Sequence, residues 1–288
     1  MKRGLKTTTK ILIIVCLIGL SLLLYPTVSN YINRKNSTKA ISTYVETLDG
    51  FSSEQISKAW ADARAYNEDL AKEGVSFSLP DSLRIRYQEN LNIDGTGLMG
   101  YIEIPKLDVS VPIYHGTTET VLQRAIGHIN WSSLPTGGAS THCVISGHRG
   151  LPSAKLFTDI DQLREGDTFE LMVLDQKLTY EVDQIRTVLP SEVSDLMIIN
   201  GKDYCTLVTC TPYGINTHRL LVRGHRIENI IGEARVVSEA VLIDELIVAS
   251  ILATPILFVL LLMVLLKKPD AKKKKINKAL SEYGGKNT

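Results

Sequence analysis

A cysteine and an arginine nine positions apart are the first candidates for chemistry in this chain of 288 residues. Cys210 ends a β-branched run that begins at Thr206 and precedes a Pro-Tyr-Gly turn signal, and Arg219 opens a second apolar run. If the two runs pair as antiparallel neighbours, Cys210 and Arg219 lie side by side at about 5 Å. A thiolate is a nucleophile, and a guanidinium, which carries donors only, suits a carboxylate or a developing oxyanion. The spacing therefore predicts a catalytic corner.

A cysteine nucleophile also needs an acid/base partner, because the leaving group must be protonated. The best candidate is His148, which follows another β-type run and lies in the segment Ser-Gly-His-Arg-Gly. His128 and His142 compete with it as the base. Arg223 competes with Arg219, because it lies on the same strand face.

The four cysteines indicate thiol chemistry rather than a metal site, because they form no pair of CxxC units. Cys16 lies in an apolar span, which leaves Cys143, Cys205 and Cys210 in the body of the chain. We expect Cys143 and Cys205 to be small core residues and Cys210 to be free. A disulfide between Cys205 and Cys210 is the alternative, although five residues along one strand they face opposite sides.

The elements that must position these side chains are mostly strands, because short apolar runs with turn punctuation follow one another from residue 99 to 230. Before them, residues 51–73 have the pattern of an amphipathic helix with Ser52 or Ser53 as its N-cap, and residues 83–92 have that of a polar loop. Seven or eight strands with few helices predict a closed or sandwiched all-β domain. The expected strands are 100–104, 109–114, 141–146, 168–174, 178–188, 204–209 and 219–226.

Two apolar stretches flank this body and predict a membrane protein. Residues 11–28 are preceded by basic residues, and residues 246–266 are long enough to cross a bilayer and are followed by a lysine-rich tail. Basic residues at both ends place both termini in the cytoplasm and the middle outside the cell. The first stretch could also be a cleaved signal peptide, but no clear cleavage site follows it. The net charge of +1 gives no case for nucleic acid.

Taken together, these motifs resemble the sortases. The resemblance rests on Thr-Leu-Val-Thr-Cys at 206–210, Ser-Gly-His-Arg-Gly at 146–150 and the arginine at 219, and the longer agreement from Gly97 to Gly224 is similar to the class C, pilin-polymerising branch. It covers roughly residues 50–230 and the membrane ends. It implies a mainly β fold, a closed eight-stranded sortase-type β-barrel with short helices, an N-terminal helix and two flanking transmembrane helices.

The resulting domain organisation has seven parts. They are a basic cytoplasmic N-terminus (1–10), a signal anchor (11–28), an extracellular helical and lid-like region (29–98), the β-barrel catalytic domain (99–230), a linker (231–245), a transmembrane helix (246–266) and a basic cytoplasmic tail (267–288).

The resemblance also implies the roles of the site residues. Cys210 is the nucleophile that forms a thioacyl intermediate, His148 the acid and base, and Arg219 the group that holds the peptide or oxyanion. Thr209 is a candidate for substrate binding, or a strand residue that faces the core. The expected partners are pilin or surface-protein substrates with a sorting signal such as Leu-Pro-any-Thr-Gly, cleaved between Thr and Gly, and the Lys amine of another pilin as acceptor. No metal or organic cofactor is implied, and the expected location is the Gram-positive cell membrane.

One departure from the class C pattern concerns the lid. Class C sortases usually carry an Asp-Pro-aromatic motif that plugs the active site, whereas this chain has Leu79-Pro80-Asp81-Ser82 with no aromatic residue after the proline. Asp81 is either a lid anchor or an ordinary turn residue.

Three other functions remain open from the sequence. The enzyme could attach surface proteins to the cell-wall precursor, it could be a cysteine protease in which water resolves the thioester, or the chain could be a non-catalytic surface scaffold.

Overall fold

The computed structural model describes residues 7–74, 79–229, 253–254 and 257–258. The chain divides into two compact units, one of residues 1–27 with 238–288 and one of residues 28–237. Among the described residues, one helix is long and apolar enough to cross a membrane, the stretch Ile11–Asp49. The predicted second transmembrane helix at 246–266 lies almost entirely outside the described residues.

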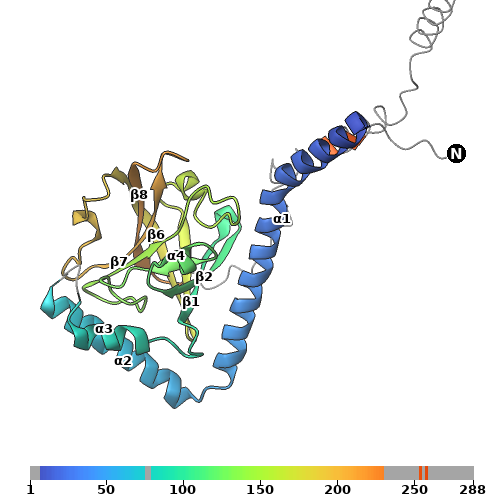
Figure 1. Ribbon diagram of the computed structural model, residues 1–288. Coiled ribbons are helices and arrows are strands. Elements are labelled where there is room, and N and C mark those ends of the chain that lie inside the picture. Colours follow the sequence, from blue (N-terminus) through green and yellow to red (C-terminus); the bar gives the residue numbers. More distant parts are fainter. Residues whose placement is uncertain (1–6, 75–78, 230–252, 255–256, 259–288) are drawn as a thin grey trace, which may run out of the picture. The chain divides into compact units, whose positions relative to one another are not determined.

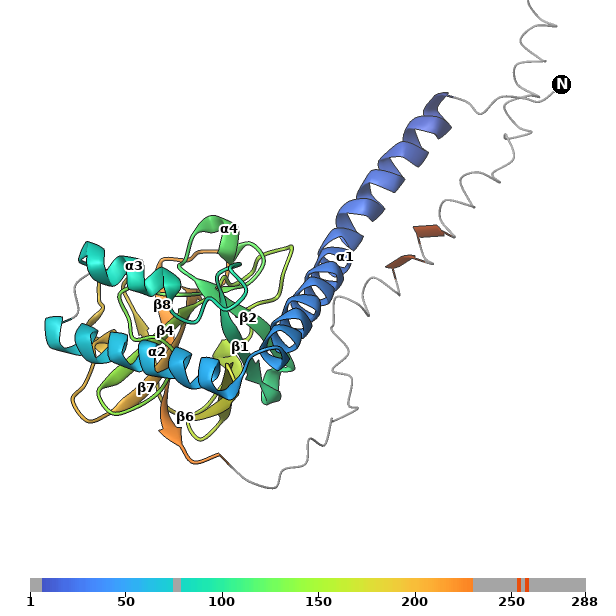
Figure 2. The same ribbon diagram turned by 90° about the horizontal axis from the view of Figure 1, so that it is seen from below.

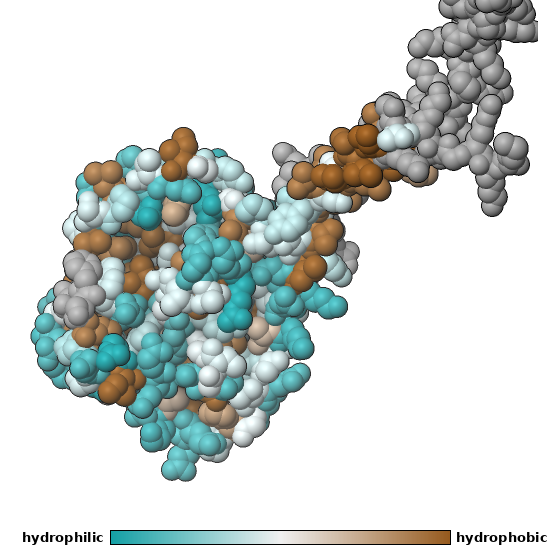
Figure 3. All heavy atoms as spheres, in the orientation of Figure 1, coloured by the Kyte–Doolittle hydropathy of each residue, from teal (hydrophilic) through white to brown (hydrophobic). Residues whose placement is uncertain are grey.

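The first helix, α1 (Thr7–Asp49), is longer than the apolar run predicts and continues past Pro26. Figure 3 shows hydrophobic side chains along its first part. Its later part belongs to the second unit and is fixed there by Tyr44. The Tyr44 hydroxyl donates to the Met99 carbonyl (3.1 Å) and accepts from the Leu174 backbone N–H (2.8 Å), and its ring is buried.

Helix α2 (Ser53–Glu73) confirms the predicted amphipathic helix. Ser52 is its N-cap and forms a capping box with Gln55, so two of the free N–H groups at this end are satisfied. Trp60, Tyr66 and Leu70 are among the side chains that it buries. The Asn67 amide fixes the helix to the barrel, because it hydrogen-bonds both the backbone N–H and the carbonyl of Leu134.

The polar loop predicted at 83–92 is wrong, because residues Asp81–Glu89 form helix α3. Its polar composition conceals two apolar side chains four residues apart, Leu83 and Tyr87, which share a face and are buried. An ion pair of 2.8 Å from Arg86 to Asp69 joins α3 to α2. Figures 1 and 2 show the two helices side by side against the barrel.

Eight strands form the predicted closed barrel, in the order β1-β2-β3-β4-β7-β8-β6-β5. The pairs β2–β3 and β4–β7 are parallel and the others antiparallel. The strands are β1 (Leu98–Ile104), β2 (Val109–His115), β3 (Ile126–His128), β4 (Thr141–Ser146), β5 (Thr168–Val173), β6 (Gln176–Val188), β7 (Asp203–Thr211) and β8 (His218–Ile227). The sequence missed β3, whose three residues are too few to show an alternating pattern.

Short helical turns connect several of the strands, close to residues 118–125, 156–163 and 191–196, where the sequence predicts helical pieces. They are α4 (Glu119–Leu122), η2 (Ile160–Gln162) and η3 (Ser194–Leu196), with a further turn, η1 (Pro105–Leu107), after β1.

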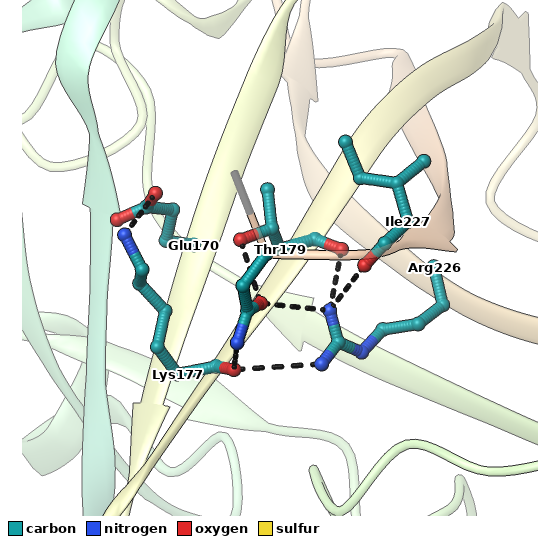
Figure 4. Close-up of polar contacts among 6 residues, drawn as sticks. Glu170, Lys177, Thr179, Arg226 and Ile227 are labelled. Atoms are coloured by element: carbon teal, nitrogen blue, oxygen red, sulfur yellow. Dashed lines mark hydrogen bonds and ion pairs between the residues drawn. The ribbon is translucent and has the colours of Figure 1, made fainter. Parts of the chain in front are cut away.

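The barrel interior is apolar. At the barrel end where β8 finishes and β6 begins, hydrogen bonds from an arginine hold these two strands together. Phe169 and Tyr180 stack there with ring centroids 5.6 Å apart. At the end of β8, the Arg226 guanidinium donates to the carbonyls of Thr179 and Lys177 on β6 (Figure 4). The side chain of Asn229 also hydrogen-bonds Thr179 and Lys177. The last strand is thus tied to β6 where the described barrel ends.

Candidate active site

The predicted pairing of the two motif strands is present. β7 and β8 are antiparallel, and Cys210 and Arg219 are directly opposite each other as Cα partners. Residues 205 and 207 of β7 belong to the barrel core, so alternation places Cys210 on the outer face. All four cysteines are free, Cys143 and Cys205 are buried, and Cys210 is half-buried. The expected disulfide-free arrangement of the three body cysteines is therefore confirmed.

His148 reaches this corner through the parallel pairing of β4 with β7. Ser146 is the partner of Val208, and the Gly147 backbone N–H donates to the Val208 carbonyl (3.0 Å). Two residues beyond this last pair, the two segments of the chain reach His148 and Cys210. The His148 side chain is 30% exposed. Residues 62 positions apart in the sequence thus lie at the same end of a parallel strand pair.

Arg219 is held by the carbonyls of its own turn. Its Nη1 donates to the Asn216 carbonyl (3.2 Å) and the His218 carbonyl (3.1 Å). Within the part of the chain that the structure describes, Nε and Nη2 have no protein acceptor. A guanidinium fixed at one nitrogen presents its other donors in a defined direction, which suits an oxygen that acquires negative charge beside Cys210.

Thr209 faces the opposite side from Cys210. It is 1% exposed, and its hydroxyl donates to the Gly147 carbonyl (2.8 Å). The side chain therefore ties β7 to the residue before His148. Contact between Thr209 and a substrate remains a prediction from the sequence.

The competing histidines are occupied in the barrel wall. The His128 Nε2–H donates to the Ser133 carbonyl (2.8 Å), and Nδ1 accepts from the Tyr87 hydroxyl (3.1 Å). The His142 Nδ1–H donates to the Met197 carbonyl (2.9 Å), and Nε2 lies 2.7 Å from a threonine hydroxyl of β7. Both rings are almost fully buried, and burial lowers the pKa of His142. Neither ring is positioned to exchange a proton with a substrate.

The competing arginine is occupied as well. Arg223 forms a two-pronged ion pair with Asp183, at 2.9 and 3.0 Å, and its guanidinium lies 4.2 Å from the centre of the Tyr204 ring. Both partners are mostly buried. Arg223 is therefore a structural residue four positions along β8 from Arg219.

A carboxylate that the sequence did not single out lies beside His148. Glu119 Oε2 is 3.8 Å from His148 Nε2, and the other oxygen of the carboxylate binds the Gln123 side-chain amide. Glu119 opens the short turn α4, and no local pattern links it to a residue 29 positions later. It is 70% exposed, so its effect on His148 is screened by water.

An apolar cluster packs on the outer side of the barrel strands, the side that Cys210 also faces. A second cluster of buried side chains, separate from the barrel interior, packs there against Ile129 and Trp131. Figure 3 shows hydrophobic side chains gathered in a hollow over β7 and β8. A hollow with hydrophobic walls suits the apolar part of an extended peptide. The cluster consists of Val144, Val188, Leu196, Val208 and Leu221.

The lid-like segment is only partly described, since residues 75–78 lie outside the described residues. Asp81 is the first residue of α3 and pairs with Arg84 one turn later at 2.7 Å, with both side chains exposed. Asp81 is thus an ordinary helix-start residue in the described structure.

Comparison with known proteins gives a consistent result. The Sortase domain model matches residues 102–227. Sortase C1 from Streptococcus agalactiae is 51% identical, with a TM-score of 0.65, and the match covers 66% of this chain and 99% of that one. Sortase C from Streptococcus pneumoniae is 43% identical, with a TM-score of 0.60 and coverage of 66% and 97%. Sortase C from Clostridium perfringens, solved with a C-terminal cell wall sorting motif, is 43% identical, with a TM-score of 0.59 and coverage of 67% and 100%.

Curated relatives are more distant. Sortase D from Bacillus subtilis is 29% identical over 131 residues, which are 44% of this chain and 63% of that protein. Sortase A from Listeria monocytogenes is 27% identical over 215 residues, which are 74% of this chain and 89% of that protein.

Proposed function

Because this chain belongs to the sortase family of cysteine transpeptidases, and to its class C branch, we propose that it joins pilin subunits at the cell surface. In this proposal it cleaves a Leu-Pro-any-Thr-Gly sorting signal between Thr and Gly and transfers the acyl group to a lysine amine of another pilin. The observation that carries the proposal is the convergence of Cys210, Arg219 and His148 at one barrel edge through the β4–β7 and β7–β8 pairings.

The first half of the reaction forms a thioester. The Cys210 thiolate attacks the carbonyl carbon of the signal's Thr, and the negative charge that develops on the carbonyl oxygen is stabilised by Arg219. As the bond to the Gly nitrogen breaks, His148 donates its proton to the departing amine. The products are an acyl group on the sulfur and a free peptide amine.

The second half forms the new amide bond. Neutral His148 accepts a proton from the attacking lysine amine, the amine nitrogen bonds to the thioester carbon, and the thiolate leaves. The hollow with hydrophobic side chains over β7 and β8 (Figure 3) supports this proposal, because it can hold the apolar residues of the signal while the Thr–Gly bond lies at the sulfur.

Two further features support the finer parts of the proposal. The pneumococcal sortase C structure gives insight into pilin substrate specificity, and the clostridial sortase C was solved with a cell wall sorting motif. The helix stretch Ile11–Asp49 can anchor the enzyme to the membrane, where surface proteins are exported.

The experiment is a transfer reaction with the full chain in detergent. A Leu-Pro-any-Thr-Gly peptide is incubated with a lysine-containing pilin peptide, and products are identified by mass. We expect an amide-linked product that is absent with Cys210→Ala. A peptide acid as the only product would identify a protease, and transfer to a cell-wall precursor amine but not to the pilin lysine would identify an anchoring sortase.

A further inference from the structure

Arg149 follows His148 directly and is a charged residue with an unusual degree of burial. Its side chain is 11% exposed. Burial of an unpaired charge is costly, so such a side chain is stable only where it is paired and hydrogen-bonded. The partners of this guanidinium therefore show what it holds together.

The guanidinium bridges two segments that meet at the active site. Nη1 donates to the hydroxyl of Thr211 (3.2 Å), the residue after Cys210. Nη2 pairs with the carboxylate of Asp161 in η2. Nε is buried without a hydrogen-bond partner among the described residues. Arg149 thus connects the residue that follows the candidate base to the residue that follows the nucleophile.

The same loop is fixed on both sides by its neighbours. The His148 carbonyl accepts from the Phe157 backbone N–H (3.3 Å). Gly150 has a positive φ of 75°, and a Cβ there would lie 2.9 Å from the ring of Tyr213, so the β7–β8 turn packs directly on this glycine. The backbone at His148 and Gly150 is therefore held against Phe157 and against the β7–β8 turn.

Strand pairing alone does not fix the distance between His148 and Cys210. The pairing of β4 with β7 ends in two hydrogen bonds at Gly147, to Val208 and Thr209, one residue before the histidine. Along the described chain beyond that point, the Arg149 bridge to Thr211 is the next connection. A displacement of about 1 Å between reacting groups can lower a rate by about 100-fold, so this bridge lies where position matters most.

We propose that Arg149, oriented by Asp161, is a positioning residue that sets the separation of His148 and Cys210. The inference rests on the proposed function of these two residues. In this proposal Arg149 does not contact the substrate. Arg149 affects the reaction by holding the loop that carries His148 against Thr211.

The test uses the full chain with the substitutions Arg149→Met, Arg149→Lys and Asp161→Asn and a double variant that combines Arg149→Met with Asp161→Asn. Three quantities are measured, namely single-turnover acylation by a Leu-Pro-any-Thr-Gly peptide, the pH profile of Cys210 alkylation by iodoacetamide, and the midpoint of thermal unfolding. We expect Arg149→Met to lower acylation by about tenfold or more and to move the alkylation profile toward that of His148→Ala.

The other variants separate positioning from general stability. Arg149→Lys keeps the positive charge but loses the second hydrogen-bonding nitrogen of the guanidinium, so its acylation rate should lie between those of Arg149→Met and wild type. The double variant should be no slower than Arg149→Met, because the two residues act as one unit. The matched control is Arg223→Met, which breaks an arginine–aspartate pair of similar burial, 17% exposed, away from the loop. It should lower the unfolding midpoint and leave acylation by the folded enzyme within about twofold of wild type.

Two results would overturn the inference. One is an acylation rate and alkylation profile in Arg149→Met that match wild type, and the other is an equal loss in Arg223→Met. If Arg149→Met does not fold, the same measurements are made on Asp161→Asn. A lowered acylation rate in Asp161→Asn supports the inference, and a rate equal to that of wild type overturns it. If the wild-type enzyme forms no acyl product, the proposed function has failed, while the alkylation profile still reports whether Arg149 controls the pairing of His148 with Cys210.

Discussion

The buried hydroxyl of Thr209 gives the sharpest test of how the site is held. Thr209→Val keeps the shape of the side chain and removes only the donor that bonds the Gly147 carbonyl at 2.8 Å. A lost hydrogen bond costs about 1 kcal/mol, and a buried carbonyl left without its partner raises the cost toward about 3 kcal/mol. For a unit of about 200 residues, each kcal/mol lowers the unfolding midpoint by about 2–4 °C.

We therefore expect Thr209→Val to lower the unfolding midpoint by about 2–12 °C. Circular dichroism of the detergent-solubilised chain during heating measures the midpoint, and peptide titration measures KM for the signal. Because the side chain faces away from Cys210, the expected change in KM is small. An unchanged midpoint together with a strongly raised KM would refute this reasoning, since it would show that the hydroxyl serves the substrate rather than the Gly147 carbonyl.

Two further predictions concern charge. Glu119→Gln should change the acylation rate by no more than about fivefold, because an exposed ion pair contributes about 0–1 kcal/mol. Stopped-flow kinetics measures the acylation rate. A loss of rate near that of His148→Ala would show that the carboxylate is essential. Burial lowers the pKa values of His142 and of His115, the last residue of β2. The unfolded chain therefore binds protons at these histidines more readily than the folded chain does. Their contribution to the stability of the fold is fully present above about pH 6.5 and is lost as the pH falls. Unfolding midpoints at about pH 7.5 and about pH 5.5 should differ less in His142→Gln than in wild type, and equal differences would contradict the assignment.

The sequence was sufficient to predict that Cys210 and Arg219 lie opposite each other. Both residues stand at the ends of apolar runs separated by a short turn, and antiparallel pairing across such a turn fixes which residues are neighbours. The convergence of His148 could not be derived in this way. It depends on a parallel pairing of β4 with β7 across 62 positions, which no local pattern in the sequence indicates.

Helix α3 and the Arg149 bridge were both missed because they depend on contacts that exist only in the folded protein. α3 is rich in charge, and its stability comes from two side chains buried against the barrel, Leu83 and Tyr87, rather than from a helical pattern in the segment itself. The bridging role of Arg149 is equally hidden, because its partner Asp161 is twelve positions away and the two meet only in the folded loop.

We propose Cys210 as the nucleophile of an acyl transfer. The most direct measurement is the intact mass of the full chain after incubation with a Leu-Pro-any-Thr-Gly peptide, for wild type and for Cys210→Ala. We expect an adduct equal to the peptide truncated after Thr, present in wild type and absent in the variant. An adduct that persists in Cys210→Ala would contradict it, and so would a wild-type chain that forms no adduct although iodoacetamide labels Cys210.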